Sequence, residues 1–134
     1  MMPFKLKIVT ADGLFFDGEA EQLIVRTATG DIGILAGHIN CVAALGVGRA
    51  TIVQEGKKRY GACIGGMVSV LGGEVTLVPT TFEWAEDIDL ARAKRSEDRA
   101  QKTLKDKGAT EMDIRVAQAR LRRALVRSSV ANHK

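Results

Sequence analysis

The 134-residue chain has few of the residues on which most catalytic and metal sites depend. It contains two cysteines, Cys41 and Cys63, and two histidines, His38 and His133. Two widely spaced cysteines do not make the framework of a disulfide-rich secreted protein. No Cys/His cluster has the spacing of a zinc site. We therefore expect no catalytic constellation, no metal centre and no catalytic cofactor, and we expect both cysteines to pack as small hydrophobic residues.

The chain also lacks a long hydrophobic run. Its longest uncharged stretch, residues 32–48, is interrupted by four glycines and falls short of the roughly 20 apolar residues of a membrane-spanning helix. The first residues have no apolar segment of the kind found in a signal peptide. We expect no direct insertion into a membrane, so that any membrane location comes through a partner.

Glycine, aromatic residues and net charge are distributed unevenly along the chain. Residues 1–80 contain 13 of the 14 glycines, and their 7 basic and 7 acidic side chains cancel. Residues 81–134 contain only Gly108 and carry 13 basic against 9 acidic side chains, which accounts for the whole net charge of +4. All aromatic residues lie at or before Trp84. This shift predicts two domains, residues 1–84 and residues 85–134.

The first part has the pattern of short strands. Phe4, Leu6 and Ile8 alternate with lysines, which is the period of a half-buried strand. Further β-branched runs occupy residues 23–25, 50–53, 67–71 and 74–78. Turn signals containing glycine separate the runs, at residues 12–13, 17–18, 29–31, 55–56 and 72–73. Many short strands with glycine-rich turns predict an all-β sandwich or barrel.

The second part has the pattern of two helices. Residues 89–107 contain no Gly or Pro, and we expect Gly108 to cap the first helix at its C-terminal end. Thr110 and Asp113 have the spacing of a capping box that opens the second helix. The short link makes the pair an antiparallel hairpin. The apolar stripes of the two helices are Leu90, Ala93, Ala100 and Leu104, interrupted by Glu97, and Ile114, Ala117, Leu121, Ala124 and Leu125.

The seam of this hairpin is thin because alanines supply much of it. A buried CH₂ contributes about 0.8 kcal/mol, so alanines stabilise a seam less than leucines. We therefore expect a stable sandwich and a marginal hairpin. A marginal element with two packings suits a conformational switch, but an ordinary frayed C-terminus is equally marginal.

Two other ligand classes have weak support. Residues 61–66 (GACIGG) begin like a phosphate-binding loop, but Met67 stands where the lysine belongs and a strand is expected to follow. The pI of about 9.3 is compatible with nucleic-acid binding. However, acidic residues are interspersed among the basic ones, and the second part has no aromatic residue on which bases could stack. We expect no nucleic-acid partner, and an RNA-binding adaptor is the least favoured interpretation.

Arginines on the helices form the one candidate ligand site. On a helix, Asp89, Arg92 and Arg99 fall within an arc of about 80°, and Arg123 and Arg127 form an i, i+4 pair. Both sets lie away from the apolar stripes. Converging guanidinium groups can bind a polyphosphate. The alternative is a solvated face on which Asp89 and Arg92 make a local pair. The residues alone leave both interpretations open.

Three motifs, in this order and at these distances, resemble the epsilon subunit family of the F-type ATP synthase over the full length of the chain. They are residues 30–38 (GDIGILAGH), residues 65–70 (GGMVSV) and residues 88–93 (IDLARA). The first motif carries Ala36 where the family usually has proline. The resemblance implies a ten-stranded β-sandwich followed by a two-helix hairpin.

The resemblance also implies a function. The resemblance implies that the chain is a non-catalytic rotor subunit of the central stalk. The sandwich of such a subunit binds the gamma subunit and the c-ring, and thereby couples proton-driven rotation to ATP synthesis. The hairpin, when extended, reaches the alpha and beta subunits and inhibits ATP hydrolysis. The implied location is peripheral, on the cytoplasmic face of the cell membrane. The alternative from another class is a free-standing ligand-binding β-sandwich with a structural helical tail.

The resemblance finally implies an ATP site on the retracted hairpin, with ATP as a regulatory ligand and any Mg²⁺ held by the nucleotide. Glu83 and the backbone of Ile88 and Asp89 would hold the adenine end, and arginines would hold the phosphates. These arginines are Arg92, Arg99, Arg123 and Arg127, with Arg122 as the alternative to Arg123. Asp31 and His38 would lie on the sandwich surface that faces the c-ring or gamma.

Overall fold

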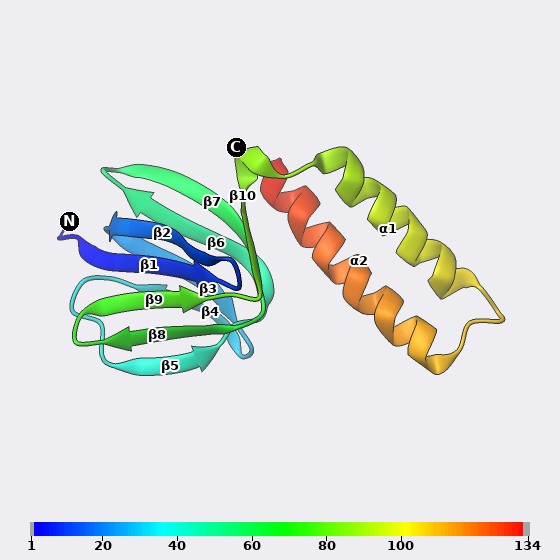
Figure 1. Ribbon diagram of the computed structural model, residues 1–134, viewed down its shortest axis with the longest axis horizontal. Helices are drawn as coiled ribbons and strands as arrows, with labels where there is room; N and C mark the ends of the chain where they lie inside the picture. Colours follow the sequence, from blue (N-terminus) through cyan, green and yellow to red (C-terminus); the bar gives the residue numbers. More distant parts are fainter. Residues whose placement is uncertain (1, 133–134) are drawn as a thin grey trace. The chain divides into compact units, whose positions relative to one another are not determined.

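The computed structural model describes residues 2–132 and divides into two compact units, Met1–Trp84 and Ala85–Lys134. The first unit contains ten strands in two five-stranded sheets (Figure 1). The second contains one 3₁₀ turn and two α-helices. The expected β-sandwich followed by a two-helix hairpin is confirmed.

The two sheets have different strand orders. One sheet has the order β2 (Gly13–Ala20), β1 (Phe4–Thr10), β9 (Glu74–Val78), β8 (Met67–Leu71) and β5 (Cys41–Ala44). The other has the order β10 (Thr81–Trp84), β7 (Lys57–Ile64), β6 (Val47–Gln54), β3 (Gln22–Thr27) and β4 (Gly30–Ile34). Among the strands of residues 2–132, only β1 and β9 pair in parallel. The strands β4 and β5, consecutive in the chain, are therefore edge strands of opposite sheets.

The core lies between the inner faces of the two sheets. Phe4, Leu6 and Ile8 are buried while the lysines between them are exposed, as the alternating pattern predicts. Strand β3 repeats the alternation with Leu23 and Val25 fully buried. This period of two brings one apolar face of each strand into the same interior.

Four of the five expected turn signals lie at hairpins, at residues 12–13, 29–31, 55–56 and 72–73, and one does not. Glu55 and Gly56 have φ values of 50° and 77°, and the Gly72–Gly73 turn also has positive φ at both residues, as two-residue hairpins require. Asp17–Gly18, expected as a turn, lies inside β2, where it pairs with β1. A Cβ on Gly18 would lie 3.0 Å from the Phe16 ring, so glycine serves packing there.

The helices of the second unit are α1 (Leu90–Lys105) and α2 (Glu111–Ala131), preceded by the 3₁₀ turn Ala85–Asp87. The expectation that the first helix continues to residue 107 and is capped by Gly108 is wrong. The helix ends at Lys105, and Asp106 is its C-cap. The Asp106 carboxylate accepts the Gly108 backbone N–H at 2.9 Å, so this side chain turns the backbone before glycine is reached.

The capping box at the start of α2 is confirmed. The Thr110 hydroxyl accepts the Asp113 backbone N–H at 3.1 Å, and the Asp113 carboxylate accepts the Thr110 backbone N–H at 3.0 Å. Hydrogen bonds from the Thr110 backbone N–H, and secondarily from its side chain, lower the pKa of Asp113. The charged carboxylate therefore favours the folded helix start.

Alanines form the seam between α1 and α2, as expected. Ala93, Ala100, Ala117 and Ala124 are each at most 4% exposed. Leu125, expected in the same stripe, is 47% exposed. It follows Ala124 by one residue, about 100° around the helix, and so turns away from the seam.

The two cysteines are unbonded, and Cys63 belongs to the core. Burial raises the pKa of the Cys63 thiol to about 12. Cys41 is half-buried and packs against the same core. Within residues 2–132, no helix is long and apolar enough to cross a membrane.

Candidate nucleotide site and subunit interface

Asp89 forms the N-cap of α1. Its carboxylate accepts the Arg92 backbone N–H at 3.0 Å, and its backbone is extended, so it stands just outside the helix. The predicted arc of three helical residues is therefore correct only for Arg92 and Arg99. A capping aspartate at this position stabilises the helix start and leaves the arginine side chains to other partners.

The register of the hairpin places three of the predicted arginines on one side of it. Ala100 of α1 and Ala117 of α2 line the same hollow, which fixes how the antiparallel helices meet. Arg92 and Arg99 each precede a seam alanine of α1 by one residue, and Arg123 precedes Ala124. One residue is about 100° around a helix. Because α1 and α2 run antiparallel, a residue just before a seam alanine projects to the same side of the hairpin whether it belongs to α1 or to α2.

Arg127 belongs to this side as well, whereas Arg122 does not. Arg127 follows Ala124 by three residues, which is about 60° short of a full turn of the helix. Arg127 therefore lies about 60° from the seam, on the same side as Arg123. Arg122 precedes Ala124 by two residues and points away from α1. Accordingly, Arg123 and Arg127 are half-buried and Arg122 is exposed. We call Arg92, Arg99, Arg123 and Arg127 the arginine side of the hairpin.

Arg120 is a further member of this side that the sequence analysis missed. It follows Ala117 by three residues, as Arg127 follows Ala124. It lines a shallow hollow of about 270 Å³ together with Thr103 of α1 and Asp113 of α2. The spacing of residues 120, 123 and 127 is a helical repeat that the sequence already contains.

The remaining predicted nucleotide residues are distributed over both units. Ile88 lies between the 3₁₀ turn and α1 and is buried. Glu83 belongs to β10 of the sandwich, where it is half-buried and lies opposite Ala62 of β7. Its role at an adenine ring stays a prediction.

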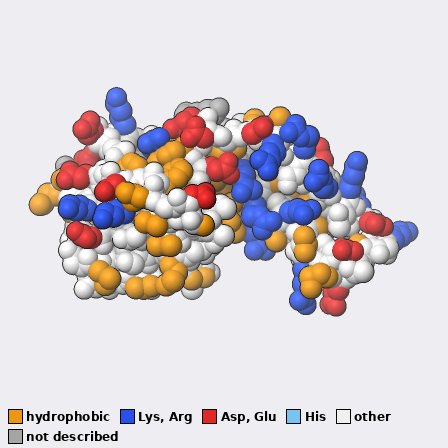
Figure 2. Space-filling model, viewed as in Figure 1, with side chains coloured by type: hydrophobic (Ala, Val, Ile, Leu, Met, Phe, Trp, Pro, Cys, Tyr) orange, Lys and Arg blue, Asp and Glu red, His pale blue; other side chains and the backbone are white. Residues whose placement is uncertain are grey.

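The hairpin presents mixed but mainly basic charge. Figure 2 shows Lys and Arg side chains gathered over it, with Asp and Glu between them. Among the described residues, no three His, Cys, Asp or Glu side chains are grouped as metal ligands. Guanidinium groups on one side of the hairpin can bind phosphate oxygens in pairs.

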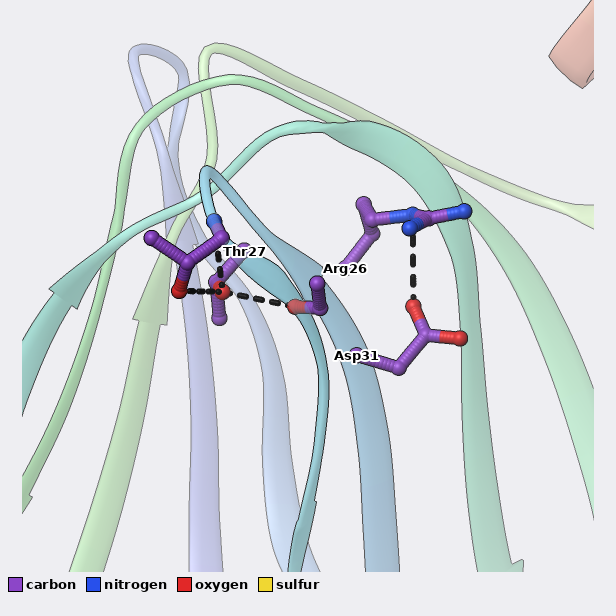
Figure 3. A network of polar contacts seen from close by, with 5 residues as sticks. Arg26, Thr27 and Asp31 are labelled. Atoms are coloured by element: carbon purple, nitrogen blue, oxygen red, sulfur yellow. Dashed lines mark hydrogen bonds and ion pairs between the residues drawn. The ribbon is translucent and has the colours of Figure 1, made fainter.

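On the sandwich, Asp31 is paired with a residue that the sequence analysis did not single out. The Arg26 Nε atom of β3 lies 3.3 Å from the Asp31 Oδ1 atom of β4 (Figure 3). The two residues are opposite each other in the strand register. Their side chains are 52% and 60% exposed, so the pair lies at the surface. Only the pairing of β3 with β4 brings them together.

Thr27 fixes the turn that leads from this pair into β4. Its hydroxyl donates to the Gly30 carbonyl at 2.6 Å and accepts the Thr29 backbone N–H at 3.3 Å (Figure 3). The residue is 5% exposed, so these bonds satisfy a buried hydroxyl. They hold the β3–β4 hairpin in one geometry and thereby set the position of Asp31.

His38 lies in the loop between β4 and β5, beyond the other end of β4 from Asp31. Its backbone N–H donates to the Leu35 carbonyl at 3.1 Å, and its Nδ1 atom lies 2.8 Å from the Ile39 carbonyl. Neighbouring Leu35 and Ile39 are 46% and 77% exposed. The structure therefore does not bring His38 and Asp31 into one cluster.

The outer face of β5, β8 and β9 carries a row of exposed apolar side chains. Ala44, Met67 and Val78 lie opposite one another across the three strands. Val42 and Leu71 lie on the same face, opposite Ser69 and Glu74, and are 57% and 58% exposed. Figure 2 shows hydrophobic side chains along this part of the sandwich, where Figure 1 places β5 and β8. Several exposed apolar side chains on one sheet face are typical of a protein interface.

Both units match families of known proteins. Residues 3–85 match the family described as ATP synthase, Delta/Epsilon chain, beta-sandwich domain. Residues 86–132 match the ATP synthase, Delta/Epsilon chain, long alpha-helix domain. The chain belongs to the ATP synthase delta/epsilon chain family. The resemblance to the epsilon subunit is thereby confirmed.

Curated relatives agree along the whole chain. The ATP synthase epsilon chain of Ruminococcus albus is 43% identical over all of both chains. That of Shouchella clausii is 36% identical over all of this chain and 98% of the relative. As a member of this family, the chain is a non-catalytic subunit of the ATP synthase complex.

Solved structures share the fold. A chain in the cryo-EM structure of the Euglena gracilis mitochondrial ATP synthase (OSCP/F1/c-ring) aligns with a TM-score of 0.84 at 21% identity, over 98% of this chain and 82% of that one. A chain in the Tetrahymena thermophila mitochondrial central stalk/c-ring structure aligns with a TM-score of 0.61 at 14% identity, over 95% of both chains. At these identities the likeness concerns the fold.

Proposed function

We propose that this epsilon-family chain is a rotor subunit in the central stalk of a proton-translocating ATP synthase, and that it is peripheral to the cytoplasmic face of the cell membrane. The observation that carries the proposal is the family match over both units, residues 3–85 and 86–132. The central-stalk and c-ring assemblies that contain its structural neighbours support the placement.

The sandwich is proposed to dock on the gamma subunit through the outer face of β5, β8 and β9, and on the c-ring near Asp31 and His38. The apolar row through Met67 and Val78 supports the first contact, because exposed apolar side chains grouped on one face are typical of a protein interface. Asp31, which is exposed, and His38, which is half-buried, support the second contact as two separate polar positions.

Co-purification tests the docking. The chain is expressed with its ATP synthase and purified from gently solubilised membranes, and gamma is expected to accompany it. Met67→Lys, on the apolar row, should release the chain from gamma, whereas Leu14→Lys should not. Leu14 is 61% exposed and lies on β2, away from that row. A wild-type chain that elutes alone would refute the rotor assignment and favour the free-standing sandwich.

The hairpin is proposed to bind ATP on its arginine side when retracted, and to inhibit ATP hydrolysis when extended towards alpha and beta. The arginines that project to one side support phosphate binding. ATP that binds only the retracted form shifts the population towards it by mass action. The thin alanine seam supports a hairpin that can open.

Calorimetric titration of the isolated chain with ATP tests this site, because two arginines of the arginine side, Arg92 and Arg123, each have a nearby arginine that points away from the seam. Arg92→Ala and Arg123→Ala are expected to weaken ATP binding at least tenfold, which is about 1.4 kcal/mol. Arg95→Ala and Arg122→Ala, two exposed positions directed away from the seam, are expected to leave it unchanged. Equal losses in all four variants would indicate non-specific charge attraction instead of a site.

A further inference from the structure

The seam alanines set the register along the whole hairpin. Ala100 of α1 and Ala117 of α2 line the same hollow. Ala93 and Ala124 are also buried, and each lies seven residues nearer the base of the hairpin, the end at which α1 begins and α2 ends. The helices run antiparallel (Figure 1), so equal steps along both keep the alanines of each pair at one level. Residues of α1 can therefore be assigned levels on α2.

This register divides the arginines of the arginine side into two groups. Arg92 of α1 lies at a level between Arg123 and Arg127 of α2, and these three residues are called the base group. Arg99 of α1 lies close to the level of Arg120 of α2, and these two residues are called the tip group. Because a helix rises about 1.5 Å per residue, the tip group lies about 10 Å further from the base.

The surface between the two groups carries a short side chain and no carboxylate. Ser96 is half-buried and lies on the arginine side midway between the two arginines of α1. The acidic residues of α1, Glu97 and Asp98, turn to the opposite side, because they follow a seam alanine by four and five residues. The carboxylates of Asp89 and Asp113 lie at the two ends of this surface, where each accepts a backbone N–H at a helix start. The space between the groups is thus open to an anion.

The tip group has no partner for its charge within the hairpin. Among residues 2–132, neither Arg99 nor Arg120 forms an ion pair, and both side chains are exposed. Arg120 lines the shallow hollow of about 270 Å³ between the helices, together with Thr103. A terminal phosphate offers nearly two negative charges and three acceptor oxygens, more than a phosphate within a chain. Two guanidinium groups at nearly the same level are suited to bind it.

The order of residues along the hairpin assigns these groups to parts of a nucleotide. The proposed adenine contacts, Ile88 and Asp89, directly precede Arg92 at the base, so the triphosphate extends towards the tip. We propose that Arg120, together with Arg99, binds the terminal phosphate of ATP and makes the site prefer ATP to ADP. The base group binds the phosphates that both nucleotides share. This inference rests on the proposed function, which places ATP on the arginine side.

Calorimetric titration of the full chain with ATP and, separately, with ADP tests the assignment. Arg120→Ala is expected to weaken ATP binding about tenfold and to change ADP binding less than about twofold, because only ATP carries the terminal phosphate. Arg123→Ala, in the base group, is expected to weaken the binding of both nucleotides. Arg122→Ala removes the same charge from the opposite face of α2, and as the control it should change neither affinity.

Two further measurements separate ligand binding from a structural role of Arg120. Arg120→Lys keeps the charge but lacks the planar fork, and it is expected to recover ATP affinity to within about threefold of wild type. Amide exchange of α1 and α2 without nucleotide is expected to be the same in Arg120→Ala and in the wild type, because Arg120 has no ion-pair partner among the described residues.

Four results would overturn the inference while the wild type still binds ATP. The first is a wild-type chain that binds ADP as tightly as ATP. The second is an Arg120→Ala chain with unchanged ATP affinity. The third is an equal loss for ATP and ADP, since Arg120 would then contact a shared phosphate. The fourth is faster amide exchange in nucleotide-free Arg120→Ala, since the arginine would then stabilise the hairpin itself. A wild-type chain that binds neither nucleotide would instead refute the proposed ATP site.

Discussion

Arg122 and Arg123 are adjacent in the sequence and chemically identical, and only their direction from the helix axis separates them. The alanine seam gives that direction, because Arg123 lies beside the seam and Arg122 lies opposite it. Charge counts alone leave the two interchangeable. At this scale, the position of a side chain relative to its packed neighbours decides which ligand it can reach.

Gly66 in the sandwich is a second residue whose role is decided by its packed neighbours. Its φ is 93°, and a Cβ there would overlap the Val78 carbonyl oxygen and lie 2.7 Å from the Pro79 Cα atom. Gly66→Ala is expected to lower the free energy of unfolding by on the order of 3 kcal/mol, from strained φ and collision with backbone. Urea unfolding measures this loss. Gly33→Ala, at a glycine where a Cβ would meet no atom within 4 Å, is the control and should change stability by less than about 0.5 kcal/mol; similar losses in both would contradict the argument.

In the hairpin, the N-terminus of each helix is capped, but the interface between the two helices buries mainly alanine side chains. Asp89 caps α1, and Thr110 and Asp113 cap α2, so each helix is locally favoured. Between the helices, however, the fully buried contacts come mainly from alanines. Well-capped helices with little buried area can separate without unfolding, which is what a retracting and extending hairpin requires.

The seam is tested by a larger side chain. Ala100 is 1% exposed, and Ala100→Leu is expected to overpack the seam at a cost of about 1–3 kcal/mol. Amide exchange should accelerate in α1 and α2 while β6 and β7 keep their protection. Ala91→Leu, at an exposed position of α1, is the control and should leave exchange unchanged. Acceleration in the strands as well would mean that the two units unfold together.

The capping box predicts an acid-sensitive start of α2. Hydrogen bonds from Thr110 lower the pKa of Asp113 below its ordinary value of 3.8. A carboxylate with a lowered pKa contributes stability above the unfolded pKa and loses it as the pH falls through the folded pKa. We therefore expect hairpin stability to decline below about pH 4. Asp113→Asn should flatten this decline in amide exchange of α2, and an unaltered pH profile would show that other groups cause it.

At the scale of the whole molecule, the two units have separate cores. Every residue of the sandwich core, from Phe4 to Trp84, precedes the hairpin. The sandwich therefore has the buried area of an independently stable domain, whereas the hairpin carries the net positive charge. This separation suits a docking domain joined to a regulatory one.

Deletion of all residues after Asp87 tests this separation. The shortened chain is expected to unfold cooperatively as a sandwich, with circular dichroism that has lost its helical contribution. In the assembled ATP synthase it is expected to raise ATP hydrolysis, because the proposed inhibitory hairpin is gone. An insoluble product would show that the sandwich needs the hairpin, and unchanged hydrolysis would argue against inhibition.

The sequence by itself determined the elements and their family. Local periodicity, turn residues and caps specify strands and helices over a few residues, and the three motifs at residues 30–38, 65–70 and 88–93 identify the family. Asp17–Gly18 and Gly108 were misassigned because a paired strand and the Asp106 side chain outweighed local turn preference. The tertiary structure alone decided which residues meet. Arg26 joins Asp31 through the register of the β3–β4 hairpin, and the arginine side arises from the packing of α1 against α2, because local sequence patterns do not specify how two elements pair or pack.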